Sequence, residues 1–515
     1  MMKNIPAIIV NQWLPQWEAA EFDEGKHRRR PLEHFYVTSM SAEKLRKLSA
    51  VSRRDDTDTQ SRVQDTGVQR RHNPERSKEI SEYVRTGYPL SELSDKDRND
   101  DDNINLIKPG WLPTAIVVNV LNSDDTRRGE KVKREDLVHI EDDEKNVMAK
   151  ITLPEAYSQD WEPGTIAPIE VIDGQHRLWA FDGDGDHDYQ LPVVIFHGLD
   201  ISWQAYLFYV INIKPAKIKA SLAYDLYPLL RTEDWLETPG TPTVYRETRA
   251  QELTEALWSY PRSAWYKRIN MLGESGRGKQ VTQSAWIKSL LTSFIKKWQV
   301  SGGKPGGLYG APTGKLPRVL PWTRSQQAGL LILIWNSVEK AVENTNADWA
   351  AEERKTIDGE NSPKGGAPLS AKWDAAFHGP TSLLNTDQGV RAILAVYNDT
   401  LFVRADELGL QEIAPNDFTE GTSFTGIEQA INSFEQTPAI SDFIDALSAE
   451  VAKYDWRTSG AKSITGEETR DLKSRFRGSA GYRQLRQDVL KFLTHSECAD
   501  VAISSKTVLE RLGWS

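Results

Sequence analysis

The sequence predicts an α/β domain followed by a mostly α-helical region. Between residues 112 and 213, short β-branched runs alternate with amphipathic stretches, which is typical of an α/β domain. Beyond residue 220, helical periodicity dominates and glycine-rich segments interrupt it. A chain of 515 residues is also too long for one ordinary hydrophobic core, so two or three domains are expected.

The elements of the α/β domain, residues 31–220, are expected in a definite order. Three β-branched runs of strand length predict its strands: residues 112–120, 169–172 and 191–196. Capping signals indicate helices that begin near Ser41, Asn73 and Ser202. The charged segment 122–145 is an insertion or a hairpin. Residues 1–30 are expected to be a flexible lead-in.

The remainder of the chain, residues 221–515, is expected to form one or two mostly helical domains. The stretches with helical spacing are residues 251–260, 284–298, 325–342, 388–401, 441–454 and 482–493. Several of the 17 tryptophans fall in these stretches, among them Trp265, Trp286 and Trp335. We expect them to be large core anchors and not a stacking surface for bases.

Composition and charge narrow the class of protein. The single cysteine, Cys498, excludes a disulfide framework within the chain. No run approaches the 18 apolar residues of a membrane span, and no leader pattern opens the sequence, so we expect a cytoplasmic protein without a membrane partner. The net charge of −10 argues against a polycation that coats DNA, although arginine clusters near the N-terminus leave room for a local basic face.

The most informative motif is Asp173-Gly174-Gln175-His176-Arg177. An apolar strand ends in an Asp-Gly turn, and a helix then opens on Gln-His-Arg. Backbone N–H groups at a helix start, together with a permanent cation and an imidazole, favour phosphate binding. The motif therefore predicts a phosphate site.

The motif and its surroundings resemble the bacterial DGQHR-domain family of the ParB/sulfiredoxin-like superfamily. The resemblance covers about residues 60–220 and also includes Gln69-Arg70-Arg71 before Asn73-Pro74, the strand that begins at Leu112, and the helix that ends in Asn212. Within that superfamily, the chain is similar to the B components of DNA-modification systems, which insert 7-deazaguanine or phosphorothioate into DNA. This resemblance implies a ParB/sulfiredoxin-like fold for residues 31–220.

The resemblance also implies roles for individual residues. Gly174 would let the backbone approach a nucleotide, while His176 and Arg177 would contact its phosphates. Asp173 or Gln175 would place the attacking water, and Asp173 is the carboxylate nearest to a hydrated Mg²⁺. The further nucleotide-binding candidates are Arg70, Asn212 and Lys214.

Two positions depart from the related patterns. Gln175 stands where sulfiredoxin has its cysteine, which excludes repair of sulfinic acid. Ile211 replaces the glutamate that precedes the matching asparagine in ParB, so Asp173 is the alternative metal ligand.

Three functions follow as hypotheses. The first is a nucleotide-binding, ATP-hydrolysing accessory component of a DNA-modification and restriction system of the 7-deazaguanine insertion type, which defends against phage. It would use ATP or another NTP with Mg²⁺ and act on DNA with a modifying partner such as a DNA-guanine transglycosylase. The second is a non-enzymatic DNA-binding transcriptional regulator of a phosphorothioation-type gene cluster. The third is a ParB-like nuclease.

Two other patterns are weaker. Residues 273–279 have the spacing of a phosphate-binding Walker loop, but Gln280 stands where Ser or Thr should bind Mg²⁺. The alternating aspartates of residues 182–188 lack the glycine and glutamate of a calcium loop. We interpret both segments as loops.

Overall fold

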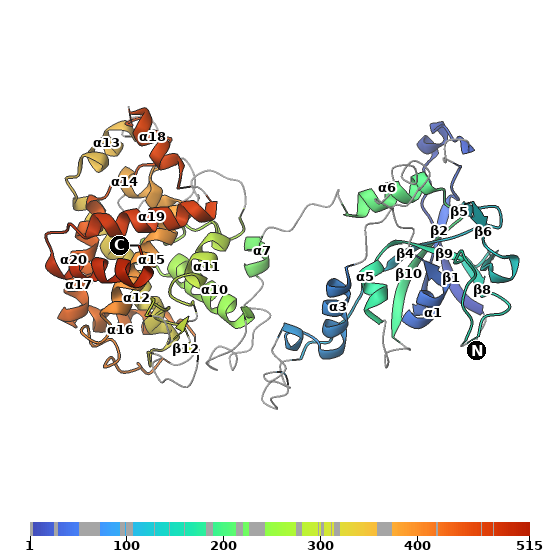
Figure 1. The fold of residues 1–515 in the computed structure, drawn as a ribbon, viewed down its shortest axis with the longest axis horizontal. Coiled ribbons are helices and arrows are strands. Elements are labelled where there is room, and N and C mark those ends of the chain that lie inside the picture. The colour runs from blue at the N-terminus through green and yellow to red at the C-terminus, as the bar shows by residue number, and fades with distance from the viewer. Residues whose placement is uncertain are drawn as a thin grey trace. The chain divides into compact units, whose positions relative to one another are not determined.

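A computed structural model of the chain divides into two compact units, Met1–Lys217 and Ile218–Ser515 (Figure 1). It describes residues 4–24, 29–50, 73–92, 98, 107–127, 129–143, 145–158, 160–181, 189–212, 220–225, 243–273, 281–296, 298–299, 303–310, 312–313, 320–357, 373–418, 421–464, 466–476 and 478–514.

The N-terminal unit is built on a mixed sheet with the strand order β3-β9-β4-β10-β2-β1-β8-β7. Its strands are β1 (Asn4–Asn11), β2 (His34–Ser41), β3 (Ser49–Ala50), β4 (Ile116–Val120), β7 (His139–Asp143), β8 (Met148–Thr152), β9 (Ile169–Asp173) and β10 (Gln190–His197). β10 pairs with β4 in parallel and β3 pairs with β9 in parallel, while the other neighbours are antiparallel. A small hairpin, β5 (Thr126–Arg127) and β6 (Glu130–Lys131), lies between β4 and β7 in the chain.

The sheet is curled, because side chains from two strands that are not neighbours in it lie in contact. β1 and β8 separate β2 from β7 in the strand order. Nevertheless His34 Nε2 on β2 lies 3.3 Å from Asp142 Oδ2 on β7, and 3.0 Å from the hydroxyl of Tyr36. Burial and the neighbouring Asp142 raise the pKa of Tyr36, which keeps its hydroxyl protonated.

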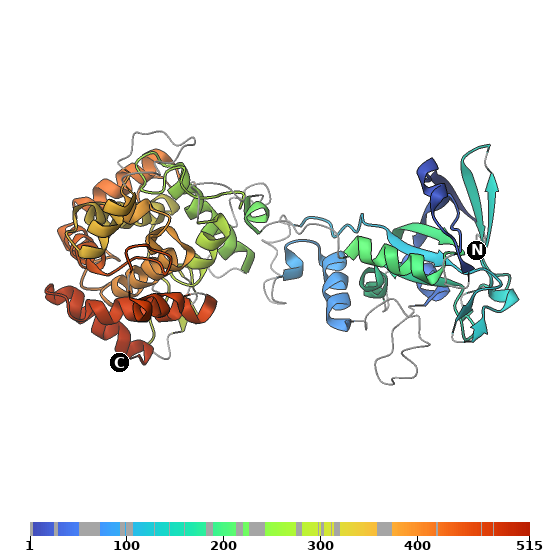
Figure 2. The same ribbon diagram turned by 90° about the horizontal axis from the view of Figure 1, so that it is seen from above.

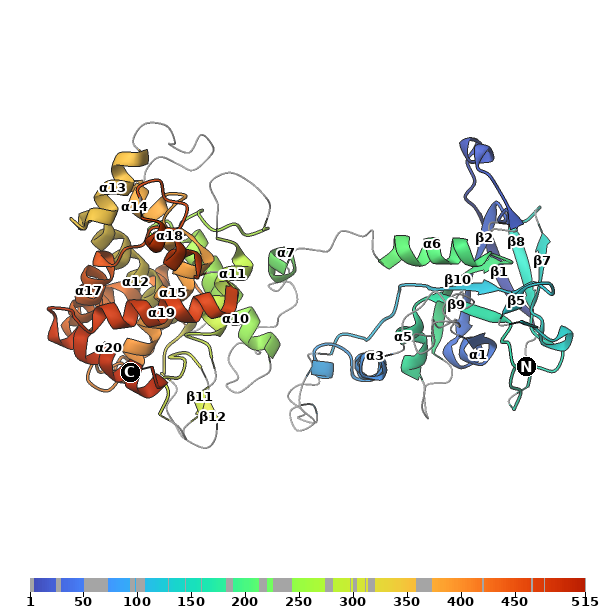
Figure 3. The same cartoon turned by 45° about the horizontal axis from the view of Figure 1, so that its top comes forward.

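Helices lie on both sides of this sheet. Figures 1 and 3 show α6 (Ile201–Asn212) on one side, and α1 (Ala42–Leu48), α3 (Pro74–Thr86) and α5 (Gln175–Leu178) on the other. Leu45 and Leu48 of α1 are completely buried, as are Val118 of β4 and Val193 of β10. Burial of such side chains is the main favourable contribution to folding, at roughly 1.5–3 kcal/mol for each.

The expectation that residues 1–30 form a flexible lead-in is wrong. Residues 4–11 are β1, which hydrogen-bonds β2 on one side and β8 on the other. Ile5, Ala7 and Ile9 alternate with exposed residues, so one face of the strand is buried. This period of two was visible in the sequence, but its pairing partners are distant in the chain.

The C-terminal unit is mostly helical. Its helices are α7 (Ala220–Asp225), α10 (Thr243–Ser259), α11 (Gln283–Leu291), α12 (Arg324–Asn344), α13 (Asp348–Ile357), α14 (Ala375–His378), α15 (Asp387–Val403), α16 (Phe424–Glu435), α17 (Pro438–Lys453), α18 (Glu467–Ser474), α19 (Gly478–Leu493) and α20 (Ala499–Leu512). Two short strands, β11 (Trp298–Gln299) and β12 (Pro312–Thr313), pair in parallel.

Helix α12 is the central helix of this unit. It contacts α10, α14, α16 and α17, and nearly all residues from Arg324 to Val338 are buried. A capping box begins the helix. The Thr323 hydroxyl accepts from the Gln326 backbone N–H, and the Gln326 side-chain oxygen accepts from the Thr323 backbone N–H.

Three tryptophans of this unit, Trp265, Trp286 and Trp335, are core anchors, as the sequence predicts. The rings of Trp265, Trp286 and Trp335 meet edge to face with centroids 5.0–5.4 Å apart. All three side chains are completely buried or nearly so. A mixed sheet with helices, followed by a mostly helical unit, therefore agrees with the predicted fold class at this level of detail.

Candidate functional site

The Asp173–Arg177 motif forms a tight turn between β9 and α5. Gly174 has φ 93° and ψ 14°, the left-handed conformation that glycine adopts without strain. A Cβ at Gly174 would lie 2.7 Å from Ile116 Cδ1 and 2.9 Å from Arg177 Nη2. The turn therefore requires glycine both for its backbone conformation and for the space that the Arg177 guanidinium occupies.

Three elements bring polar side chains together at this turn. Arg177 Nη2 donates to Asp173 Oδ2 at 2.8 Å, and Arg177 Nη1 donates to the carbonyl of Thr114 at 3.3 Å. Asn212, the last residue of α6, donates from Nδ2 to Asp173 Oδ1 at 3.1 Å. The side chains of Asp173 and Arg177 are each 18% exposed, so a ligand can reach this cluster, which we call the Asp173 cluster (Asp173, Arg177 and Asn212).

His176 holds the motif against α3. Its Nε2 accepts a hydrogen bond from the backbone N–H of Asn73 at 3.2 Å, and its carbonyl accepts from the Ser77 hydroxyl at 3.2 Å. Asn73 is the N-cap of α3, with its side chain accepting from Glu75 and Arg76 backbone N–H groups. While this contact is made, Nε2 carries no proton, so this nitrogen does not offer a cation to a phosphate.

Gln175 is the most buried residue of the Asp173–Arg177 motif. It is 6% exposed, and its Oε1 is buried and pairs with no donor among the described residues. Unpaired buried acceptors cost about 1–3 kcal/mol. Gln175 is thus a neutral acceptor beneath the turn.

Several predicted site residues lie outside the described residues. Arg70 and Lys214 are in this group, as are most of the Walker-like segment 273–279 and the aspartate-rich segment 182–188. The residues that the structure brings together are Asp173, Gly174, Arg177 and Asn212.

The donor set of the Asp173 cluster is compatible with a hydrated Mg²⁺. Each carboxylate oxygen of Asp173 accepts one hydrogen bond from Arg177 or Asn212 and keeps a second lone pair, while Asn212 turns its amide Nδ2 toward this carboxylate. Mg²⁺ in nucleotide sites keeps several waters and takes one or two carboxylates with the phosphates. Within the described ranges, no group of three or more His, Cys, Asp or Glu side chains could hold a metal ion on its own.

Sequence reasoning missed the contribution of Thr114 and of a buried ion pair behind the turn. The carbonyl of Thr114 orients Arg177, and a backbone carbonyl has no sequence signature. On the same strand as Asp173, Glu170 binds Arg127 through two hydrogen bonds of 2.6 and 2.8 Å and also accepts from Gln204 of α6 at 2.9 Å. This pair anchors α6, and so Asn212, to β9.

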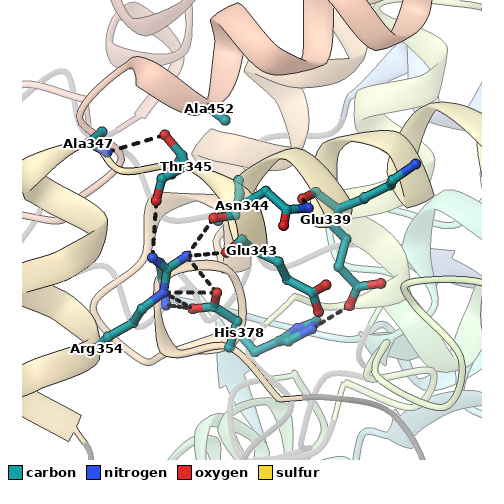
Figure 4. Close-up of polar contacts among 12 residues, drawn as sticks. Glu339, Glu343, Asn344, Thr345, Ala347, Arg354, His378 and Ala452 are labelled. Atoms are coloured by element: carbon teal, nitrogen blue, oxygen red, sulfur yellow. Dashed lines mark hydrogen bonds and ion pairs between the residues drawn. The ribbon is translucent and has the colours of Figure 1, made fainter.

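A second group of titratable residues lies in the C-terminal unit (Figure 4). His378 Nε2 lies 2.7 Å from Glu339 Oε1, and Arg268 contacts the His378 ring. Burial raises the pKa of Glu339 to about 7; Arg268 opposes this shift and Asp374 adds to it. Burial also holds the pKa of His378 well below its usual value, with Arg268 contributing.

Next to this group, Arg354 of α13 hydrogen-bonds to the C-terminal end of α12. Its guanidinium binds the Asp374 carboxylate at 2.7–3.2 Å and donates to the carbonyls of Val342, Glu343 and Thr345 (Figure 4). Arg354 thereby satisfies carbonyls at the C-terminal end of α12, which helical bonds leave open. The arrangement is typical of a structural ion pair.

No protein-family model, curated protein or solved structure matches the chain. Among the described residues, no helix has the length and apolar character needed to cross a membrane.

Proposed function

We propose that the turn at Asp173–Arg177 binds the phosphates of ATP or another NTP. On this proposal the protein is an ATP-hydrolysing accessory component of a DNA-modification and restriction system of the 7-deazaguanine insertion type. The observation that carries the proposal is the Arg177 guanidinium, which Asp173 and the Thr114 carbonyl hold over the left-handed Gly174 turn.

The arrangement leaves Arg177 able to bind an anion. A guanidinium has five N–H donors, and the hydrogen bonds of Arg177 to the Thr114 carbonyl and to Asp173 use one at Nη1 and one at Nη2. The remaining donors suit the planar, two-point recognition of a phosphate. Gly174 has no side chain, so a phosphate can approach the backbone at this turn.

Asp173 and Asn212 suit the divalent ion that accompanies a nucleotide. When bound there, Mg²⁺ supplies neutralisation of phosphate charge. Asp173 offers carboxylate oxygens, which are a preferred ligand type for this ion, and Asn212 holds that carboxylate in place by donating to it from Nδ2.

Hydrolysis asks little covalent chemistry of the protein: the phosphate charge must be stabilised and a water held in line. Arg177 does the first. The carboxylate of Asp173, which is 18% exposed, is the acceptor that can orient this water; the unpaired Oε1 of Gln175 is the alternative acceptor, but it is buried and would first have to become accessible. His176 positions the turn through Asn73, while Arg70 and Lys214 are further candidate cations. DNA and a DNA-modifying enzyme such as a DNA-guanine transglycosylase are the proposed partners.

The test is nucleotide binding by the full chain, measured by anisotropy of a fluorescent ATP analogue with Mg²⁺, with and without duplex DNA. We expect Arg177→Gln to weaken binding at least about tenfold, because a charge-assisted hydrogen bond is lost. Arg177→Lys keeps the charge but not the two-point geometry, so it should recover only part of the affinity. Arg134→Gln removes an exposed arginine of the same unit and should leave binding unchanged.

Phosphate release from ATP by the same proteins then tests turnover. Circular dichroism of each variant establishes that it is folded. If the wild-type chain binds no nucleotide under any of these conditions, or if Arg177→Gln and Arg134→Gln behave alike, the proposal is wrong.

A further inference from the structure

A concentration of positive charge lies in the C-terminal unit, where α15 packs against α11 and α19. Asp399 of α15 is completely buried and binds two cations. Lys296, which follows α11, places Nζ 3.3 Å from Asp399 Oδ1, and Arg486 of α19 binds Oδ2 of the same carboxylate. One negative charge is therefore shared by two positive charges.

A third cation, Arg483, lies beside Arg486. The guanidinium groups of Arg483 and Arg486 lie 5.0 and 5.1 Å from the ring centroid of Trp514. The ring is attractive to each cation, but it brings two like charges near one another. We call Lys296, Asp399, Arg483, Arg486 and Trp514 the Asp399 cluster; it holds three cations and one carboxylate.

The Asp399 cluster also lacks acceptors. Arg486 Nε is buried and has no hydrogen-bond partner among the described residues. Both carboxylate oxygens of Asp399 already accept hydrogen bonds. Lys296 and the Asn398 side-chain amide donate to Oδ1, and Arg486 donates to Oδ2. A buried guanidinium donor without an acceptor is costly, so the site favours an additional anion.

The cations can be reached from solvent. The side chain of Lys296 is 22% exposed and that of Arg486 is 17% exposed, while Arg483 is exposed. Figures 1 and 2 show α19 and α20, in red, at the surface of the C-terminal unit. Burial lowers the pKa of Lys296; Asp399 opposes this shift and Arg486 adds to it.

More basic residues continue this surface along the same helices. Arg391 of α15 lies 4.6 Å from the ring centroid of Tyr482 on α19. Lys288 of α11 is exposed and interacts electrostatically with Asp387 of α15. Each of the three helices α11, α15 and α19 thus carries at least one basic side chain.

We propose that the Asp399 cluster binds a phosphate group, with Lys296, Arg483 and Arg486 as its donors. Three cations from two elements, with guanidinium groups fixed on an indole ring, are chemically suited to a tetrahedral dianion or a phosphodiester. The source is either a free phosphate or a DNA backbone. The site lies in a different unit from the Asp173 cluster, so this proposal does not depend on the proposed nucleotide site.

The experiment uses the full chain and two probes. Inorganic phosphate is titrated by isothermal calorimetry, with chloride at the same ionic strength as the reference. A fluorescent duplex DNA of random sequence is titrated by anisotropy at several salt concentrations. Arg483→Gln tests the cluster without unpairing Asp399, and Arg486→Lys keeps the ion pair while removing the planar donor group. Lys491→Gln removes an exposed charge from the same helix and is the matched control.

We expect Arg483→Gln and Arg486→Lys each to weaken binding of at least one probe about tenfold, and Lys491→Gln to change it less than twofold. Binding of phosphate alone identifies a free phosphate as the source. Binding of DNA with a salt slope that falls by about one in Arg483→Gln identifies the DNA backbone. If neither probe binds, or if Lys491→Gln weakens binding as much as Arg483→Gln, the cluster is not a phosphate site.

Discussion

The buried carboxyl of Glu339 makes the stability of the C-terminal unit depend on pH in a way that one substitution can isolate. Glu339 lies on α12 and contacts His378, the last residue of α14, and its side chain is 20% exposed. Burial raises its pKa from 4.5 to about 7 in the folded state. The folded chain therefore holds this proton more tightly than the unfolded chain does.

The sign of the effect follows from linkage. Below pH 4.5 both states are protonated at Glu339, and the contribution to stability is complete. As the pH rises through about 7, the folded state must also ionise a buried carboxyl, and the contribution is lost. At 1.36 kcal/mol per pKa unit, the loss amounts to roughly 3 kcal/mol.

His378 acts in the opposite direction. Its pKa is lowered in the folded state, so its contribution is present above the ordinary value of 6.5 and is lost as the pH falls below it. A pH profile of the wild-type chain alone would mix the two effects. Comparison with Glu339→Gln at each pH separates them, because the variant keeps His378 and replaces the carboxyl by a neutral amide.

We expect Glu339→Gln to match the wild-type chain near pH 4.5 and to exceed its free energy of unfolding by up to about 3 kcal/mol at pH 8. The measurement is urea unfolding between pH 4.5 and 8, followed by tryptophan fluorescence. Glu435→Gln removes an exposed carboxyl of α16 and is the control. A difference between Glu339→Gln and the wild type that stays constant over this pH range would refute the reasoning.

Three further changes test other parts of the fold by urea unfolding of the full chain. Gly174→Ala should destabilise the N-terminal unit by about 2–4 kcal/mol, because a left-handed alanine is strained and its Cβ would overlap Ile116; an effect below 1 kcal/mol contradicts this. Arg127→Ala leaves the carboxylate of Glu170 buried without its ion-pair partner and should cost about 3–5 kcal/mol. Replacing both Arg127 and Glu170 by apolar residues should restore most of the lost free energy of unfolding, and a double variant as unstable as Arg127→Ala would contradict this explanation. Thr323→Ala removes one half of a capping box and should cost about 1 kcal/mol, whereas Thr323→Ser should cost little.

Local patterns in the sequence were enough to predict three of the eight strands of the N-terminal sheet and the turn after β9. The β-branched runs correctly predicted β4, β9 and β10. The Asp-Gly dipeptide correctly predicted the turn after β9, because only glycine adopts its backbone conformation without strain. β1 and β2 were not predicted, since each depends on partners that are far away in the chain.

The contacts of the Asp173 cluster are likewise of two kinds, local ones and ones between distant parts of the chain. Asp173 and Arg177 are four residues apart across a turn and a short helix, so their contact is local. Asn212 reaches Asp173 only because α6 packs on β9, where the Glu170–Arg127 pair also binds Gln204. His176 faces α3, because the N-cap of α3 presents a backbone donor to it.

The sequence by itself determined the order of strands and helices near the motif, the glycine turn and the residue types available for phosphate chemistry. Those properties depend on neighbours within a few residues. Only the tertiary structure decided which side chains are paired, how deeply Glu339 and Asp399 are buried, and that Lys296 and Arg486 share one carboxylate. Burial and pairing come from helices and strands that are distant in the chain, and the local pattern of residues does not specify how these pack.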